Sequence, residues 1–392
     1  MVSDRVKNIA PSATLAVDSK AKQLKKDGKD VLNFGAGEPD FNTPENIKEA
    51  AKKAIDKNIT RYTPVGGIPE LREAIAKKFR EINKINYDSS EVVVSAGGKH
   101  TLYNIAMTIL NNGDEAILPV PYWVSFEEMI KLAGAKAVFC STNKKFKLTA
   151  KDVEENITNK TKMLILNSPS NPSGAIVDKE EIEKIARLAV EHNFYVVSDE
   201  VYEYFVYGNN ERISIASLNT EIKNLTITAN SFSKTYAMTG WRVGYCGASR
   251  EIIKGIENLQ GHSTSNVSNI SQMAALEALN GPQDSVKEMI RAFDERRKFM
   301  HKRLNEMQGI NCNEPDGAFY AFPDISKTGM GSMEFASKLL EDALVAVVPG
   351  SAFGSDKNIR LSYATSIGDI EKGMDRMEKW LKRKFVNIPY SL

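Results

Sequence analysis

The sequence predicts an α/β protein with a large, mostly parallel sheet and a second, smaller α+β unit. From about residue 90 to residue 260, short apolar segments alternate with helical patterns. The apolar segments are nearly continuous, which is typical of parallel strands buried on both faces. Over the last hundred residues, long charged helical patterns surround a few short strand patterns. A chain of 392 residues is also long enough for two or three domains.

The large unit is expected to contain seven strands, each rich in β-branched and apolar residues. They are predicted at 91–96, 114–118, 135–140, 162–167, 194–199, 224–229 and 242–247. Helical patterns at 101–110, 123–133 and 178–192 separate some of these strands. Strands that alternate with helices in this way favour parallel pairing, because each helix returns the chain to the same edge.

The C-terminal part is expected to begin with a long charged helix over 283–307. Strands follow at 317–322, 345–349 and 358–363, with helices over 332–343 and 369–382. We place the domain boundary inside the long helix, near residue 285. The prediction is a large domain over 46–285, a small domain over 286–392, and an N-terminal segment over 1–45 that packs on the small domain.

Composition argues against several functional classes. There are 52 basic and 50 acidic side chains, so charge gives no reason to expect a nucleic-acid or membrane partner. No run of eighteen apolar residues predicts a membrane span, and the N-terminus has no apolar core of a secretory signal, so we expect a cytoplasmic protein. Cys140, Cys246 and Cys312 are expected to be buried thiols. The four histidines have no metal-ligand spacing, so no metal site is expected.

Polar residues at the carboxyl ends of the strands are the candidate site, because open α/β sheets bind ligands there. In S-A-G-G-K-H (95–100), glycines allow a ligand to approach the backbone, and the next helix offers free N–H groups to an anion. In N-S-P-S-N-P-S-G (167–174), two prolines make a rigid loop that presents Asn171. Both segments could equally be turns without a ligand.

Two further segments carry charged groups. Asp199 follows an apolar strand, so its carboxylate needs a buried partner, such as a ligand nitrogen, unless it only caps a helix. In the stretch 230–245, Ser231, Ser233 and Arg242 suit a phosphate. Nearby cations and partial burial lower the pKa of Lys234, which favours a neutral amine able to form an imine. Together these are the parts of a pyridoxal 5'-phosphate site.

At this point the chain resembles the class I aminotransferases of the aspartate aminotransferase superfamily, nearly from end to end. The motifs that carry the resemblance are G-A-G-E-P-D-F (35–41), R-Y-T-P-V-G-G (61–67), P-Y-W-V-S-F (121–126), N-P-S-G (171–174), S-D-E-V-Y (198–202), S-F-S-K-T-Y-A-M-T-G-W-R-V-G-Y (231–245) and N-I-R-L-S-Y-A (358–364). It is most similar to the bacterial and archaeal aspartate aminotransferases that begin with P-S-A-T, here 11–14. The resemblance implies the type I fold of pyridoxal-phosphate-dependent transferases.

The resemblance also implies residue roles at the cofactor ring. Lys234 forms the imine with the cofactor and then moves the proton of the substrate. Asp199 pairs with the ring nitrogen, Tyr202 and Asn171 donate to the phenolic oxygen, and Trp123 stacks on the ring.

Ser231, Ser233, Arg242 and the backbone near Gly98 and Lys99 are implied to hold the phosphate. Tyr62 is implied to reach the phosphate of a neighbouring subunit, which would make the protein a homodimer.

For the substrate, the resemblance implies that Arg360 forks to the α-carboxylate with the help of Gly37 and Asn171. We expect transfer of the amino group of an L-amino acid, best aspartate, to 2-oxoglutarate by a ping-pong mechanism. No arginine occurs over 251–290, where many relatives carry the one for the distal carboxylate. Ser12, Thr14 and Lys99 are the candidates in its place.

Alternatives stay open. An aromatic or broad-specificity aminotransferase, or a β-lyase or an oxoamine synthase on the same fold, would use the same cofactor. Ala10 stands where relatives that accept prephenate carry a basic residue, which argues against prephenate. A regulator without catalytic activity would usually add a DNA-binding domain ahead of this pattern. A dinucleotide-dependent dehydrogenase is disfavoured, because S-A-G-G-K-H lacks the G-x-G-x-x-G fingerprint.

Overall fold

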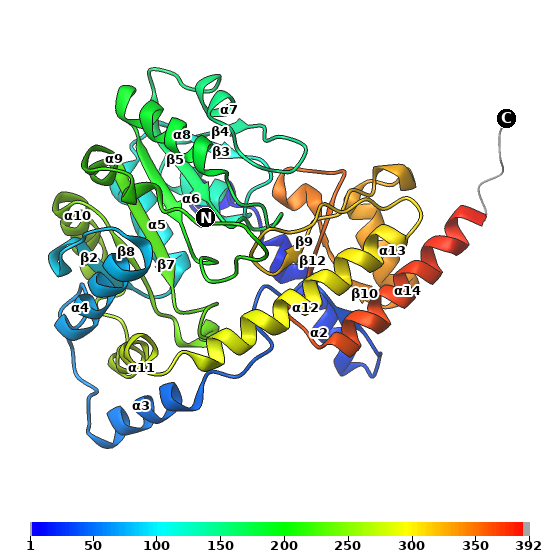
Figure 1. Ribbon diagram of the computed structural model, residues 1–392, viewed down its shortest axis with the longest axis horizontal. Helices are drawn as coiled ribbons and strands as arrows, with labels where there is room; N and C mark the ends of the chain where they lie inside the picture. The colour runs from blue at the N-terminus through cyan, green and yellow to red at the C-terminus, as the bar shows by residue number, and fades with distance from the viewer. Residues whose placement is uncertain (1, 387–392) are drawn as a thin grey trace.

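The computed structural model describes residues 2–386. Its centre is a seven-stranded sheet in the order β2-β8-β7-β6-β5-β3-β4 (Figure 1). Strand β8 runs antiparallel to both of its neighbours, and the other pairs are parallel. The mostly parallel sheet expected from the sequence is therefore confirmed. The strands are β2 Val92–Ser95, β3 Glu115–Pro119, β4 Lys136–Cys140, β5 Thr161–Asn167, β6 Tyr195–Asp199, β7 Thr226–Ser231 and β8 Gly244–Gly247.

Helices cover both faces of this sheet. Met163 and Ile165 of β5 belong to one apolar cluster, and Leu164 and Leu166 belong to another. Successive side chains of a strand point to opposite faces, so both faces are buried. This explains why the strands read as nearly continuous apolar segments. The helices around the sheet are α3 Glu45–Asp56, α4 Pro69–Lys78, α5 Gly98–Ile109, α6 Ser125–Leu132, α7 Ala150–Glu154, α8 Lys179–Glu191, α9 Thr220–Leu225, α10 Arg250–Gly261 and α11 Asn269–Asn280.

A smaller unit lies at the other end of the long helix α12 (Figure 1). It contains the sheet β11-β12-β9, whose pairs are antiparallel. Phe293 of α12, Phe335 of α13 and Trp380 of α14 share its apolar core. The elements are α12 Asp284–Glu306, β9 Tyr320–Ala321, α13 Ser332–Ala343, β11 Val348–Pro349, β12 Ile359–Ser362 and α14 Ile367–Val386.

The N-terminal segment contacts this smaller unit. After α1 (Asp4–Lys7) and α2 (Ala13–Lys26), strand β1 (Leu32–Asn33) pairs in parallel with β10 (Val345–Ala346). Ala21 of α2 packs with Leu340 and Ala346 in a small apolar cluster. These contacts place the segment beside the C-terminal elements, while the exact domain bounds at 45 and 285 stay a prediction.

The expected strand at 345–349 is divided in two. Val345 and Ala346 pair with β1, whereas Val348 and Pro349 pair with β12 in another sheet. The change of partner occurs at Val347, which is 1 % exposed. All of these side chains are buried, so the sequence shows no alternation that could reveal the change. The expected strand at 317–322 is shorter too, because only Tyr320 and Ala321 belong to strand β9, while Gly317 forms an isolated bridge with Val206.

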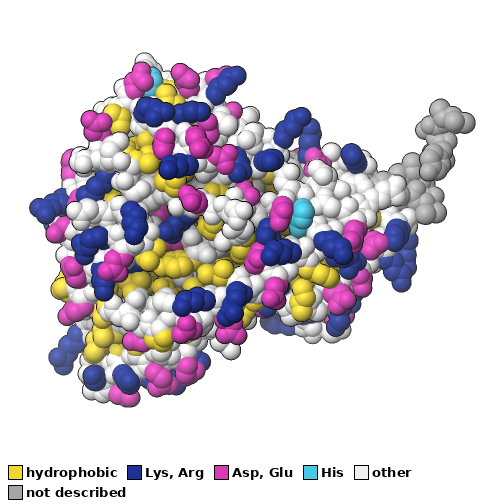
Figure 2. Space-filling view, viewed as in Figure 1, with side chains coloured by type: hydrophobic (Ala, Val, Ile, Leu, Met, Phe, Trp, Pro, Cys, Tyr) yellow, Lys and Arg dark blue, Asp and Glu magenta, His cyan; other side chains and the backbone are white. Residues whose placement is uncertain are grey.

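Basic and acidic side chains are interspersed over the face shown in Figure 2. Over residues 2–386, no helix combines the length and the hydropathy that a membrane crossing needs. Cys140, Cys246 and Cys312 are free and buried.

Candidate active site

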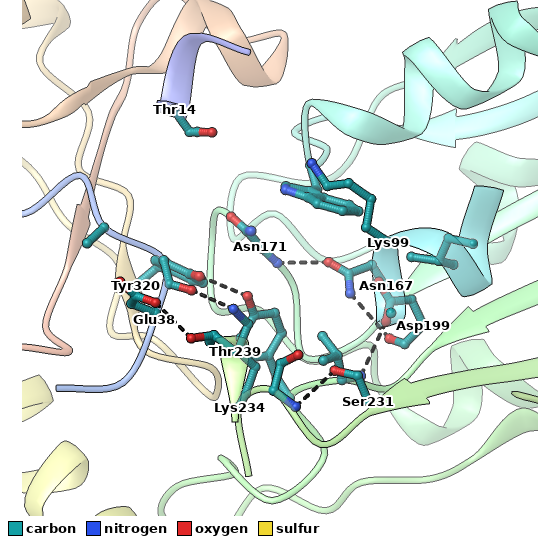
Figure 3. A pocket seen from close by; sticks show the side chains of 18 of the residues that line it. Thr14, Glu38, Lys99, Asn167, Asn171, Asp199, Ser231, Lys234, Thr239 and Tyr320 are labelled. Carbon is teal, nitrogen blue, oxygen red and sulfur yellow. Dashed lines mark hydrogen bonds between the residues drawn. The ribbon is translucent and has the colours of Figure 1, made fainter. Parts of the chain in front are cut away.

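A cavity of about 390 Å³ lies at the carboxyl ends of β5, β6 and β7 (Figure 3). The segment around Gly37 and strand β12 close it from the side of the smaller unit. The structure brings most of the expected residues together here: Thr14, Gly37, Gly98, Lys99, Trp123, Asn171, Asp199, Tyr202, Ser231, Ser233, Lys234, Arg242 and Arg360 line the cavity.

Lys234 reaches into the cavity from the turn that follows β7. Its Nζ donates a hydrogen bond to the carbonyl oxygen of Gly37 at 2.6 Å (Figure 3). Burial lowers the pKa of Lys234 to about 8; the charge of Glu38 opposes this shift, and those of Arg360 and Arg242 add to it. The sequence had suggested cations and burial together, and burial is the larger cause. A substantial fraction of this amine is therefore neutral near pH 8.

Asp199 ends strand β6 and is 5 % exposed. Burial raises the pKa of its carboxyl to about 7, against a backbone hydrogen bond from Val201 at 3.2 Å and the charge of Lys234. The bond from Val201 shows that Asp199 also stabilises the following turn. No ion pair to Asp199 is present among residues 2–386, so a cationic ligand group would find an unpaired carboxylate here.

The hydroxyl of Tyr202 lies 2.8 Å from the hydroxyl of Tyr320. Both side chains are buried, and burial raises the pKa of each phenol. Tyr320 comes from β9 of the smaller unit. No pattern in the sequence indicates this partner, because the two residues are 118 positions apart.

The N-terminus of α5 and the turn after β7 form a place for an anion. The backbone amide of Ser233 donates to Oγ of Ser231 at 3.3 Å, and both side chains are buried. Gly97 precedes α5 with φ +89°, and a Cβ there would lie 2.7 Å from Cζ of Arg242. Only glycine allows this backbone and leaves the space that the guanidinium takes. Hydroxyls, a guanidinium and helix N–H groups are the donors that bind phosphate.

Arg360 lies on β12 and is 2 % exposed. Its NH1 donates to Oδ1 of Asn171 at 3.0 Å and its NH2 to the carbonyl oxygen of Gly35 at 2.7 Å. Its guanidinium also lies 4.5 Å from the ring centroid of Tyr320. Within the described residues its buried Nε has no hydrogen-bond partner. A fixed, buried guanidinium with unused N–H groups can take a carboxylate ligand.

Lys99 lines the same cavity as Arg360. Its Nζ lies 4.9 Å from the ring centroid of Trp123, and burial lowers its pKa, with the charge of Arg242 adding to the shift. Thr14, at the start of α2, faces the same cavity (Figure 3). Ser12 lies instead on a neighbouring cavity of about 740 Å³, which Lys99 also lines.

Tyr62 is outside both of these cavities. Its side chain is 90 % exposed in the single chain. Its role toward a second subunit stays a prediction.

Several polar cavity residues were missed, among them Tyr320, Asn167, Glu38 and Thr239. Tyr320 contacts Tyr202, Asn167 accepts from the backbone amide of Asn171 at 2.8 Å, and Glu38 accepts from Thr239 at 2.8 Å. Asn167, Glu38 and Thr239 stand inside the motifs of the sequence, so their position beside Asn171, Gly37 and Arg242 was the available signal. Among residues 2–386, no three His, Cys, Asp or Glu side chains are grouped as a metal site needs.

Comparison with known proteins finds relatives that are named as aminotransferases. The family model of aminotransferase class I and II matches residues 29–377. The chain is 47 % identical to an aspartate aminotransferase of Bacillus sp. (strain YM-2), covering 97 % of this chain and 99 % of the relative. It is 48 % identical to a probable aspartate/prephenate aminotransferase of Aquifex aeolicus, covering 97 % and 98 %.

A solved structure of the aspartate aminotransferase from Thermus thermophilus with maleate superposes with a TM-score of 0.94. That match has 42 % identity and covers 97 % of this chain and 99 % of the other. The expected fold class is thereby confirmed. Given this cavity, this topology and these relatives, the chain belongs to the class I and II aminotransferase family.

Proposed function

We propose that the protein is a pyridoxal-5'-phosphate-dependent aspartate aminotransferase that uses 2-oxoglutarate as the amino acceptor. The observation that carries the proposal is the grouping of three charged side chains in one cavity. Lys234 supplies an amine with a lowered pKa, Asp199 a buried carboxylate that pairs with no cation within residues 2–386, and Arg360 a buried guanidinium. The names of the relatives from Bacillus and Thermus support aspartate as the substrate.

The donor set fits the cofactor. Ser231, Ser233, Arg242 and the first turn of α5 offer hydroxyl, guanidinium and backbone donors to a phosphate. When bound, pyridoxal phosphate supplies an aldehyde for covalent attachment of amines and an electron-withdrawing ring. Asp199 is buried in the wall of the same cavity, where an ionised carboxylate would hold a proton on a ring nitrogen.

The remaining groups act on the substrate. Arg360 binds the α-carboxylate through two N–H groups and so orients the Cα–H bond. Lys234, as a neutral amine, accepts the proton from Cα and returns it at another carbon. Lys99 and Thr14 face the side chain of the substrate, and Lys99 offers a cation to a distal carboxylate. Tyr202 donates from a hydroxyl whose raised pKa keeps it protonated.

A half-reaction screen tests the function. The cofactor-loaded protein is mixed with single amino acids, and the loss of the visible absorbance of the bound cofactor is followed without an acceptor. We expect aspartate and glutamate to react fastest, and borohydride treatment to fix the cofactor on Lys234. The absence of a reaction with any amino acid would refute the proposal. Release of pyruvate with ammonia or sulfide, without an acceptor, would identify a β-lyase instead.

Prephenate is a second candidate acceptor, because the printed name of the relative from Aquifex aeolicus includes it. Ala10, which lines the neighbouring cavity of about 740 Å³, brings no positive charge to it. We therefore expect prephenate to accept the amino group more slowly than 2-oxoglutarate. Faster turnover with prephenate would reverse this order, and faster reaction with phenylalanine or tyrosine than with aspartate would favour an aromatic aminotransferase.

We also propose a cytoplasmic homodimer in which Tyr62 reaches the phosphate site of the second subunit. The high exposure of Tyr62 and its position outside the cavities of its own chain support this arrangement. The three free thiols suit a reducing compartment. Sedimentation equilibrium tests the dimer, and a monomer that keeps full activity would contradict it.

A further inference from the structure

A group of charged and amide side chains lies buried behind the cavity, and one member of the group, Asn230, also reaches the cavity wall. We call Lys78, Asn83, Glu200, Glu203, Arg212 and Asn230 the Glu203 cluster. Five of these residues are at most 6 % exposed, and only the side chain of Arg212 is more open, at 16 %. The proposed function uses none of these side chains.

Glu203 is the centre of the cluster. Its carboxylate accepts hydrogen bonds from Lys78, Arg212, Asn83 and Asn230. The Nδ2 of Asn83 also donates to Glu200 at 2.7 Å, so one amide joins the two carboxylates. Two cations and two carboxylates leave the cluster without net charge, which is how buried charges are tolerated.

The cluster touches the cavity residues from behind at two places. Asp199 and Tyr202 face the cavity, whereas their chain neighbours Glu200 and Glu203 belong to the cluster. A backbone bond from Glu203 to Glu200 at 2.9 Å closes this turn. One side of this turn therefore faces the cavity, and the other side belongs to the Glu203 cluster.

The second place is the end of β7. Nδ2 of Asn230 donates to Glu203 at 2.7 Å, and Oδ1 of Asn230 accepts from the backbone amide of Ser231 at 2.7 Å. Ser231 is a candidate phosphate ligand, and its Oγ accepts from the amide of Ser233. A single buried side chain therefore connects the carboxylate of Glu203 to the backbone of the phosphate site.

We propose that Glu203 and Asn230 are positioning residues for the cofactor, which fix the turn of Asp199 and Tyr202 relative to the phosphate site at Ser231. A buried ion cluster adds little net stability, because desolvation of the charges offsets their attraction. Its geometric effect is larger, since ligand groups bind tightly only when their own supports hold them in place. This inference rests on the proposed function, because it assumes that pyridoxal phosphate binds in the cavity.

The test compares cofactor affinity with thermal stability. The cofactor-free protein is titrated with pyridoxal phosphate by absorbance, and its melting temperature is recorded separately. Asn230→Leu keeps the shape and removes both connecting bonds. We expect it to raise the dissociation constant of the cofactor by about 10-fold to 100-fold. The double variant Lys78→Gln/Glu203→Gln removes one charge of each sign, so the charges of Arg212 and Glu200 still balance. It should also weaken the binding of the cofactor.

Arg297 provides the matched control. It is 5 % exposed and pairs with Asp294 and Glu314 at 2.7 Å each, and none of the three lines the cavity. Arg297→Gln should lower the melting temperature but change the dissociation constant by less than about twofold. The inference is wrong if Asn230→Leu leaves the cofactor affinity unchanged, or if Arg297→Gln weakens it equally. If the unaltered protein does not bind the cofactor, the proposed function itself fails.

Discussion

The floor of the cavity and its edge at α2 are built in different ways. We call Asp199, Ser231, Ser233 and Arg360 the floor. All four are at most 6 % exposed; the first three come from strand ends or the turn after β7, and Arg360 comes from β12 of the smaller unit. At the edge, α2 buries only Ala21, and Leu15 on the same helix is 63 % exposed. Under the proposed function, the groups that would act on every substrate are tightly packed, whereas Thr14, which would face the variable side chain, lies on a loosely packed helix.

The largest effect is expected at Lys234. Lys234→Ala should retain the cofactor by its phosphate contacts but lose about 10²-fold to 10⁴-fold or more in turnover, because the amine moves the proton. Steady-state kinetics with aspartate measures the loss. Lys151→Ala on α7, with a side chain 80 % exposed, is the control and should be normal. Near-normal turnover of Lys234→Ala would end the assignment.

A smaller loss is expected at Arg360. Arg360→Leu should lower kcat/KM by about 10²-fold to 10³-fold, because a buried charged partner of the α-carboxylate is removed. The loss should be similar for aspartate, glutamate and alanine, since they share this carboxylate. Arg360→Lys should rescue little, because an ammonium cannot reproduce the planar fork. A loss confined to one amino acid would show that Arg360 contacts a side chain instead.

Asp199 predicts a pH effect on the cofactor-free protein. Burial raises the pKa of this carboxyl from 3.8 to about 7 in the folded state. Because the folded form binds the proton more tightly than the unfolded chain, Asp199 reduces stability as the pH rises through this window. The contribution is on the order of 2–3 kcal/mol, reduced because water enters the cavity.

Asp199→Asn should remove this dependence. We expect its free energy of unfolding to fall less between pH 4 and pH 7 than that of the unaltered protein, when both are measured by denaturant titration without cofactor. Parallel curves for the two proteins would mean that the carboxyl titrates normally, and would weaken its description as a buried, unpaired group.

The smallest effect is expected on α2. Oδ1 of Asp18 accepts from Asn33 at 2.8 Å, and Oδ2 pairs with Lys22 at 2.7 Å. Asp18→Ala should cost about 1 kcal/mol or less of stability, because exposed pairs contribute little. Asp27→Ala at the far end of the helix is the control, since Asp27 accepts only an exposed bond from Gln23. A loss of about 3 kcal/mol or more in the free energy of unfolding, as expected when a buried ion pair is broken, would erase the contrast between floor and edge.

The sequence predicts a site residue well where a charged side chain stands at or just after the end of a predicted strand. Asp199 and Lys234 follow apolar strands, so their place at the sheet edge could be predicted from the strands alone. The helix expected over 332–343 is α13 with the same bounds, because its apolar residues recur at helical spacing.

Contacts between distant segments were not predictable. Lys78 and Glu203 are 125 positions apart, and each alone reads as an ordinary surface charge. The split at Val347 was hidden as well, because every neighbouring side chain is buried. Pairings of this kind are set by the packing of segments that lie far apart along the chain, which no local pattern records.

The close approach of Gly97 and Arg242 has an evolutionary consequence. Any replacement of Gly97 would strain the backbone and displace the guanidinium of Arg242 at the same time. Even the smallest side chain at this position therefore has both effects. By contrast, Leu15 on the exposed face of α2 lines the same cavity without such a constraint, so substitutions that change the preference for the amino acid are expected there first.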